Sequence, residues 1–414
     1  MSNSFQKTDW VTMEALRRLV NRLEVSRYFN TSLSRDYKKP FPVGSTIYPK
    51  LPQRYIIRNG VTYVPQAIDR KTTEVKLDQI FGVDFDYDSV EKALDMERGE
   101  ELVRREYIEP AMDQLAQELD SRCAYYAMMN SPNVVGALGT TPTAVAVFHQ
   151  ARQKLVEYAV TPGEKGMIIT PGMNSTLGAN LTTLLNPQKE VSDLFRDGML
   201  GNAAGFKWHE SMSLYSHTAG TYATAGDITV TAAITDGATS VGLTSASVGC
   251  ALKAGDVISF TTPMACNPST RRSVGHAKTV VLTQDCTIAG GATGTAHFAP
   301  ALYGPNSQYQ NVDVLPNAGH VVVLFPGTTA PSGKSGMNGL ALNKDAFALV
   351  SVPMELPKST EIANQQRDPS TGISISFIRA FEPRTLTWIN RFDVMMGFGT
   401  LYPENCSVRV ASLI

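Results

Sequence analysis

Asp256-Val-Ile-Ser-Phe-Thr261 is a run of β-prone residues in the second half of the chain, and it belongs to a series. Ile228–Ile234 and Lys278–Leu282 have the same character and lie on either side of it. Turns that contain glycine, Asp236-Gly237 and Gly290-Gly291, separate such runs. Several short strands with turn signals at this spacing predict a small all-β barrel or sandwich.

The segment that contains these runs, residues 222–316, differs in composition from the rest of the chain. It has no Glu, and Thr, Ala, Gly, Ser and Val are abundant in it. After Pro316 a mixed α/β character returns with His320–Phe325. The sequence therefore predicts an all-β domain inserted into a larger α+β chain. The charged residues of the segment are Asp227, Asp236, Lys253, Asp256, Arg271, Arg272, Lys278, Asp285 and Asp313.

Helical periodicity is strongest before this segment. The pattern predicts a first helix from near Thr8, a long helix over about 99–130 and another over 143–160. Apolar residues of the long helix recur every three or four positions, so they line one face. Pro110 should kink or interrupt this helix, because proline lacks the backbone N–H and clashes with the preceding turn. The apolar residues are Ile108, Met112, Leu115, Leu119, Cys123 and Tyr126.

Residues 54–65 predict a long β-hairpin. Asn59-Gly60 stands between two β-prone flanks, and both residues tolerate the positive φ of a tight hairpin turn. This projection is basic, and two interpretations stay open: a solvated hairpin, or an arm that contacts a partner. Under the second interpretation the candidate assembly contacts are Arg54, Arg58, Asn59, Gly60, Arg70 and Lys71.

Length and charge exclude several classes of protein. The 414 residues allow two or three domains, and 37 basic against 38 acidic residues give a net charge of −1. Such a chain is not a nucleic-acid binder that depends on counter-ion release. The longest apolar run, Val321–Phe325, is far shorter than the about 20 residues of a membrane-spanning helix. We also expect no secretory signal and, from five scattered cysteines, a reducing cytoplasm.

A phosphate-binding loop is suggested by residues 327–335 but does not have the required spacing. Gly327 is followed by five residues, instead of four, before Gly333-Lys334-Ser335. The count matters because consecutive backbone N–H groups must surround the phosphate. We therefore expect a surface loop here.

Motifs for metal binding and catalysis are also incomplete. Asp84, Asp86 and Asp88 alternate as in a calcium-binding loop, but the sixth position is Ser89 instead of glycine. The six histidines are scattered, and no nucleophile elbow or dinucleotide fingerprint occurs. We expect no metal, no cofactor and no catalytic residues, which favours a structural or assembly protein over an enzyme.

Two stretches resemble a known family. Phe195-Arg-Asp-Gly-Met-Leu-Gly-Asn-Ala-Ala-Gly-Phe206 runs on to Ser213 just before the inserted segment, and Leu252-Lys-Ala-Gly-Asp-Val-Ile-Ser-Phe260 lies within it. Both are similar to the coat-protein family of the short-tailed Salmonella phage P22. The order of the predicted elements over nearly the whole chain resembles the capsid fold first known from phage HK97.

The resemblance implies five regions. They are an N-arm at 1–43, an extended loop at 44–80, a peripheral domain with a long spine helix at 81–134 and 366–414, an axial domain at 135–221 and 317–365, and the inserted β domain at 222–316.

The resemblance also implies a function. The chain would be a major capsid protein that assembles as hexamers and pentamers into an icosahedral shell around double-stranded DNA. Its partners would be further copies of itself, a scaffolding protein, a portal protein and DNA contacted without sequence specificity. Its location would be the virion, after assembly in the host cytoplasm. Two alternatives stay open: an encapsulin-like cellular compartment with the same fold, and a nucleotide-binding enzyme that uses residues 327–335.

Overall fold

The computed structural model describes residues 3–36, 44–68, 70–88, 104–182, 201–221, 228–245, 249–325, 333–356, 362–384 and 387–412. The chain divides into two compact units. Unit 1 comprises Met1–Leu51, Thr72–Cys123 and Phe347–Leu401. Unit 2 comprises Pro52–Lys71, Ala124–Ala346 and Tyr402–Ile414. Helices and strands are mixed in both units, so the predicted α+β class is confirmed.

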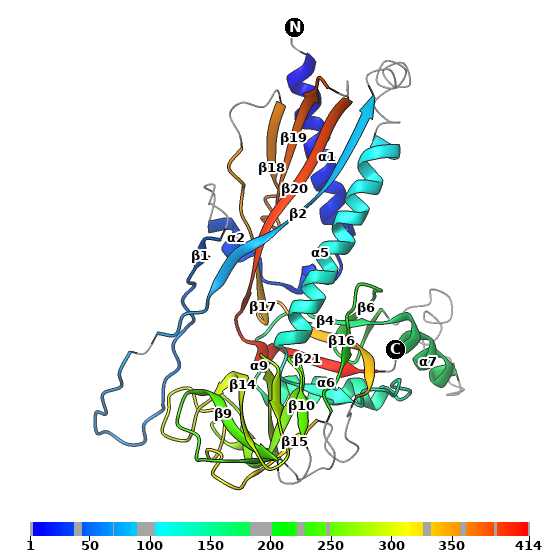
Figure 1. The fold of residues 1–414 in the computed structure, drawn as a ribbon. Helices are drawn as coiled ribbons and strands as arrows, with labels where there is room; N and C mark the ends of the chain where they lie inside the picture. The colour runs from blue at the N-terminus through cyan, green and yellow to red at the C-terminus, as the bar shows by residue number, and fades with distance from the viewer. Residues whose placement is uncertain are drawn as a thin grey trace. The chain divides into compact units, whose positions relative to one another are not determined.

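Unit 1 is built on an antiparallel sheet in the order β1-β2-β20-β19-β18, with β17 also paired to β20 (Figure 1). The long strands β2 and β20 pair from Asp88↔Thr387 to Lys76↔Phe398. Near its start β2 alternates between buried and exposed residues, which is the pattern of a strand with one covered face. The strands are β1 (Thr46–Ile47), β2 (Val75–Asp88), β17 (Phe347–Ser351), β18 (Ile362–Arg367), β19 (Ser374–Glu382) and β20 (Thr387–Thr400).

Helix α1 (Asn3–Arg22) packs on β18 and β19, and its Leu16 and Leu19 side chains are buried. It begins at Asn3, earlier than the predicted start near Thr8. Two short helices follow, η1 (Ser26–Tyr28) and α2 (Ser32–Asp36).

The predicted long helix is observed as α5 (Glu109–Asn130), preceded by a π-helical turn, η2 (Arg104–Ile108). Pro110 therefore stands in the first turn of α5, and the change of helix type lies just before it, as expected for a residue without a backbone N–H. Residues 99–103 of the prediction lie outside the described residues. The predicted apolar face is buried at Ile108, Met112, Leu115, Leu119 and Cys123.

Unit 2 contains a second sheet in the order β3-β21-β16-β4-β6-β5, and β7 pairs with β16. Phe148 and Leu155 of α6 pack with Trp208 and Met167 of the sheet to form its core. The helix predicted over 143–160 is confirmed as α6. The elements are β3 (Val134–Gly136), α6 (Val145–Glu157), β4 (Lys165–Ile169), α7 (Pro171–Thr182), β5 (Asn202–Ala203), β6 (Phe206–Glu210), β7 (Ser216–Thr218), β16 (Ser335–Asn343), α9 (Pro403–Cys406) and β21 (Ser407–Ala411).

The segment with unusual composition folds as a closed barrel in the order β11-β12-β14-β9-β8-β15. Phe260 and Phe298 meet edge to face inside it, with ring centroids 6.3 Å apart. The elements are β8 (Ile228–Val230), β9 (Ala238–Ser245), β11 (Val257–Cys266), β12 (Ser273–Leu282), β14 (Thr293–Leu302) and β15 (Val321–Leu324), with a separate pair β10 (Cys250–Leu252) and β13 (Cys286–Ile288).

The barrel requires one correction to the predicted boundary. Strand β15 pairs with β8 at Val322↔Ile228 and with β11 at Ile258↔Leu324, so it closes the barrel. The sequence predicted a strand at 320–325 but placed it in the surrounding domain, after an insertion that ended at residue 316. The placement was wrong because the partners of a short apolar strand lie far away in the sequence.

Candidate assembly surface

The predicted hairpin is an extended loop without strands. Described residues 51–68 and 70–71 contain no strand, although Gly60 has the predicted positive φ of 86°. A side chain links the two arms instead: Gln66 Oε1 accepts from the N–H of Ile56 at 2.8 Å, and Gln66 Nε2 donates to the carbonyl of Ile56 at 2.5 Å. The hairpin prediction was wrong in this respect. Pro52 and Pro65 contribute to the difference, because each lacks the N–H that a ladder of hydrogen bonds requires.

The tip of this loop exposes large apolar side chains. Val61 is 95% exposed, Ile57 87% and Tyr63 80%. Together with Arg58, which donates to the carbonyls of Gly60 and Thr62, they form what we call the loop tip, residues 57–63. An exposed apolar cluster on a thin projection is typical of a surface that another molecule covers. Sequence reasoning missed these residues because it assigned them to strands, although one short loop offers no core to bury them.

The six candidate contacts fall into two groups. Arg58, Asn59 and Gly60 are exposed at the loop tip, and Arg70 is exposed on the returning arm. Arg54 and Lys71 lie at the base of the loop, where they are half-buried within unit 2. Burial lowers the pKa of the Arg54 guanidinium, against the opposing effect of nearby Tyr402 and Tyr309. The structure thus places four of the six residues where a partner could reach them, and two against the same chain.

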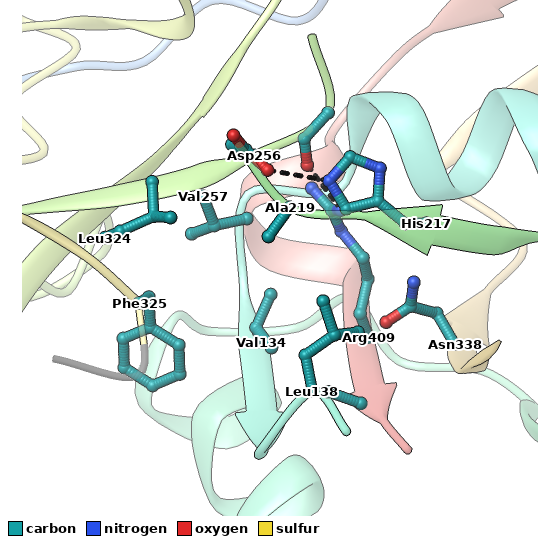
Figure 2. Close-up of a pocket in the computed structure, with 12 residues that line it drawn as sticks. Val134, Leu138, His217, Ala219, Asp256, Val257, Leu324, Phe325, Asn338 and Arg409 are labelled. Atoms are coloured by element: carbon teal, nitrogen blue, oxygen red, sulfur yellow. Dashed lines mark hydrogen bonds and ion pairs between the residues drawn. The ribbon is translucent and has the colours of Figure 1, made fainter. Parts of the chain in front are cut away.

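The junction between the barrel and the neighbouring sheet of unit 2 contains a polar cluster of His217, Asp256 and Arg409 among apolar side chains (Figure 2). Asp256 Oδ1 lies 2.7 Å from His217 Nε2, and its Oδ2 accepts from the backbone N–H groups of Gly220 at 3.0 Å and Lys253 at 2.9 Å. Beside it, Arg409 donates to the carbonyls of Ser131 and Gly255. Burial lowers the pKa of Arg409 to about 9, partly opposed by the charge of Asp256.

A second buried charge connects the barrel to the C-terminal part of unit 2. Lys278 of β12 is fully buried and forms an ion pair with Glu404 of α9. Burial lowers the pKa of Lys278 to about 7. Both junctions fix the barrel on its neighbours through hydrogen-bonded charges, which is a structural role.

A groove of about 490 Å³ runs between α6 and the barrel strands β11 and β12. Its volume would suit a small ligand, but its charged groups have partners. Glu157 Oε2 lies 3.0 Å from His276 Nε2, and Lys154 donates to the carbonyl of Val134 at 2.8 Å. Burial lowers the pKa of Lys154 to about 8. The arrangement attaches α6 to β12.

The other motifs of the sequence form no ligand site in the part of the chain that the structure describes. Asp84 and Asp86 are exposed on β2, and Asp84 lies 3.7 Å from Arg391. Within the described ranges no group of acidic, histidine or cysteine residues could hold a metal ion. Residues 327–332 of the phosphate-loop candidate lie outside the described residues. No described helix combines the length and apolarity of a membrane span.

Comparison with known proteins identifies the class. The sequence model described as "P22 coat protein - gene protein 5" matches residues 82–411, which is most of the chain. The protein is therefore a bacteriophage capsid shell protein, and it is located in the virion. It belongs to the P22 coat protein family. This family points to a structural role and to a shell of many copies, and it favours the phage shell over the cellular compartment.

Solved structures of low sequence identity are similar over most of their length. One is described as "Mycobacterium phage Che8" (10% identity, 95% of this chain and 90% of that chain, TM-score 0.44). A second is the capsid of the cyanophage P-SCSP1u (12% identity, 91% of this chain and 85% of that chain, TM-score 0.43). A third is the capsid of Ralstonia phage GP4 (8% identity, 94% of this chain and 90% of that chain, TM-score 0.41). No curated protein sequence matches the chain.

Proposed function

We propose that the chain assembles as hexamers and pentamers into a closed icosahedral shell that encloses a double-stranded DNA genome, and that the loop tip binds a neighbouring copy. The observation that supports the contact is the exposed apolar cluster at Ile57, Val61 and Tyr63. Burying such a side chain contributes roughly 1.5–3 kcal/mol, so three of them supply a useful contact for each copy. A contact of loop on neighbour is heterologous, and heterologous contacts that close generate rings.

The proposed partners follow from the same role. A scaffolding protein and a portal protein would act during assembly in the host cytoplasm. A net charge of −1 suits a wall that contacts packaged DNA without holding it, because strong binding to DNA requires many basic contacts. We keep the division into N-arm, extended loop, peripheral domain, axial domain and inserted domain as part of this proposal, with three boundaries changed. The inserted domain includes β15. Strand β17, predicted in the axial domain, pairs with β20 and joins the peripheral domain, and β21, predicted in the peripheral domain, pairs with β16 and joins the axial domain.

Two valine substitutions test the contact. Val61→Asp places a charge at the loop tip, whereas Val156→Asp places the same charge on the exposed face of α6, where Val156 is 58% exposed. We expect both variants to fold, since exposed substitutions usually change stability by about 0.5 kcal/mol or less. Only Val61→Asp should abolish shells, seen by light scattering and negative-stain microscopy with and without a co-expressed scaffold. A wild-type chain that stays monomeric or dimeric under both conditions would refute the function.

A further inference from the structure

The barrel contacts both arms of the extended loop at one place, the segment Tyr303–Tyr309 between β14 and β15. The ammonium of Lys71, on the returning arm, hydrogen-bonds to the hydroxyl of Tyr303. It also lies 3.5 Å from the centroid of the Tyr303 ring and 4.5 Å from that of Tyr309. A cation close to two aromatic rings is attracted to both ring quadrupoles.

The same segment reaches the outgoing arm. Gln308 Nε2 and Gln53 Nε2 both donate to the carbonyl of Ala67, each at 2.9 Å, so one carbonyl joins the barrel and both arms. Gln53 Nε2 also lies 3.5 Å from Gln308 Oε1. The base of the loop is therefore attached to the barrel, whereas the loop tip is exposed.

The barrel segment itself is firmly held. Arg271 Nε donates to Gln310 Oε1 at 3.0 Å and its Nη2 to the carbonyl of Pro305 at 3.1 Å. Arg271 has a φ of 59°, a costly conformation for a residue other than glycine, which persists only where the surroundings determine it. Gly304 N–H donates to Asp236 Oδ1 at 2.7 Å. The contacts with the loop thus start from a rigid support.

We propose that the barrel positions the extended loop for assembly, with Tyr303, Gln308 and Tyr309 as positioning residues that hold Lys71 and Ala67. This inference rests on the proposed function of the loop tip. A loop without a hydrogen-bonded ladder pays the full conformational entropy of ordering when it binds, unless another element orders it first. The inserted barrel orders the base of the loop before two copies meet, so less conformational entropy is lost on binding. The barrel therefore affects the rate of assembly as well as the stability of the subunit.

Two pairs of variants test the proposal in the full chain. Tyr309→Leu and Lys71→Met each remove the cation–π contact between Lys71 and Tyr309. Tyr309→Phe keeps the ring, and Lys71→Arg keeps a cation that stacks on aromatic rings. A fluorophore on Asn59→Cys reports loop motion through its anisotropy, because the five native cysteines are buried. Light scattering of the same variants with Asn59 retained and without the label reports the rate of assembly, because the label lies on the loop tip. Circular dichroism confirms that the barrel is folded.

The expected result is a lower anisotropy and an assembly rate reduced by roughly five- to thirty-fold in the first pair, with both values restored in the conservative pair. Unchanged anisotropy in Tyr309→Leu and Lys71→Met would overturn the contact. Lower anisotropy with an unchanged assembly rate would overturn its role in assembly. If the wild-type chain does not assemble at all, the proposed function fails first, and the anisotropy shows separately whether the barrel orders the loop.

Discussion

Replacing Asp256 by alanine tests the junction that holds the barrel on the sheet of unit 2. The substitution removes the acceptor of three hydrogen bonds, from His217, Gly220 and Lys253. The N–H of Gly220 is buried, and a buried donor left without an acceptor costs about 1–3 kcal/mol. The bond to His217 contributes about 1.5–3 kcal/mol because the carboxylate is charged, and the partly buried N–H of Lys253 adds a smaller amount. Since such contributions are not additive, we expect Asp256→Ala to lower the free energy of unfolding by about 3–5 kcal/mol.

Asp285, between β12 and β13, provides a matched control because it also accepts a hydrogen bond from the turn that precedes Asp256. Its carboxylate accepts from the backbone N–H of Ala254 at 2.8 Å, but Asp285 is exposed. Water can replace this acceptor, so Asp285→Ala should cost less than about 1 kcal/mol. Urea unfolding followed by far-ultraviolet circular dichroism measures both variants. If Asp256→Ala and Asp285→Ala are equally stable, the buried hydrogen bonds do not hold the junction and the reasoning is wrong.

Two further predictions concern α1 and the barrel. Arg18 and Arg22 both hydrogen-bond to Asp113, and although burial alone would raise the pKa of Asp113, these bonds lower it. The carboxylate therefore stabilises the fold above the ordinary pKa of 3.8, and this stabilisation is lost as the pH falls through the lowered value. Asp113→Asn should lower the free energy of unfolding by about 1–2 kcal/mol at pH 7 and leave it unchanged in strong acid, as measured by urea unfolding at several pH values. A difference between the variant and the wild type that does not depend on pH would contradict the pairing. For the barrel, a fragment of residues 222–325 should give dispersed amide signals in NMR spectra, whereas 222–316 lacks β15 and should not; equal spectra would show that β15 is dispensable.

Local patterns in the sequence predicted the elements well because their causes are local. The β-prone residues of Asp256–Thr261 predicted a strand, and β11 (Val257–Cys266) occupies this stretch. The spacing from Ile108 to Cys123 reflects one buried helix face. Such periodicities depend only on residues within a few positions of one another, so a single sequence contains them.

Features that depend on distant partners were not predictable in this way. Val321–Leu324 reads as a strand, but nothing within it indicates that its neighbours are Ile228 and Ile258. The loop was read as a hairpin from Asn59-Gly60, and neither the contact of Lys71 with Tyr303 nor the exposed tip could be derived from local charge. The burial of Arg409 and Lys278 could not be predicted from the sequence either, because burial depends on the whole fold.

The pairing of β2 with β20 imposes an order on synthesis. Gly82 pairs with Asp393 and Phe81 with Val394, more than 300 positions later in the sequence. Residues up to Val394 must therefore leave the ribosome before this part of the sheet can form. Until then β2 presents unpaired backbone groups and apolar residues, the kind of edge that recruits other chains in a crowded cell. Such non-local pairing also slows folding. Because a shell takes many copies of this subunit, the unpaired edges of newly made chains have to stay apart until each sheet is complete.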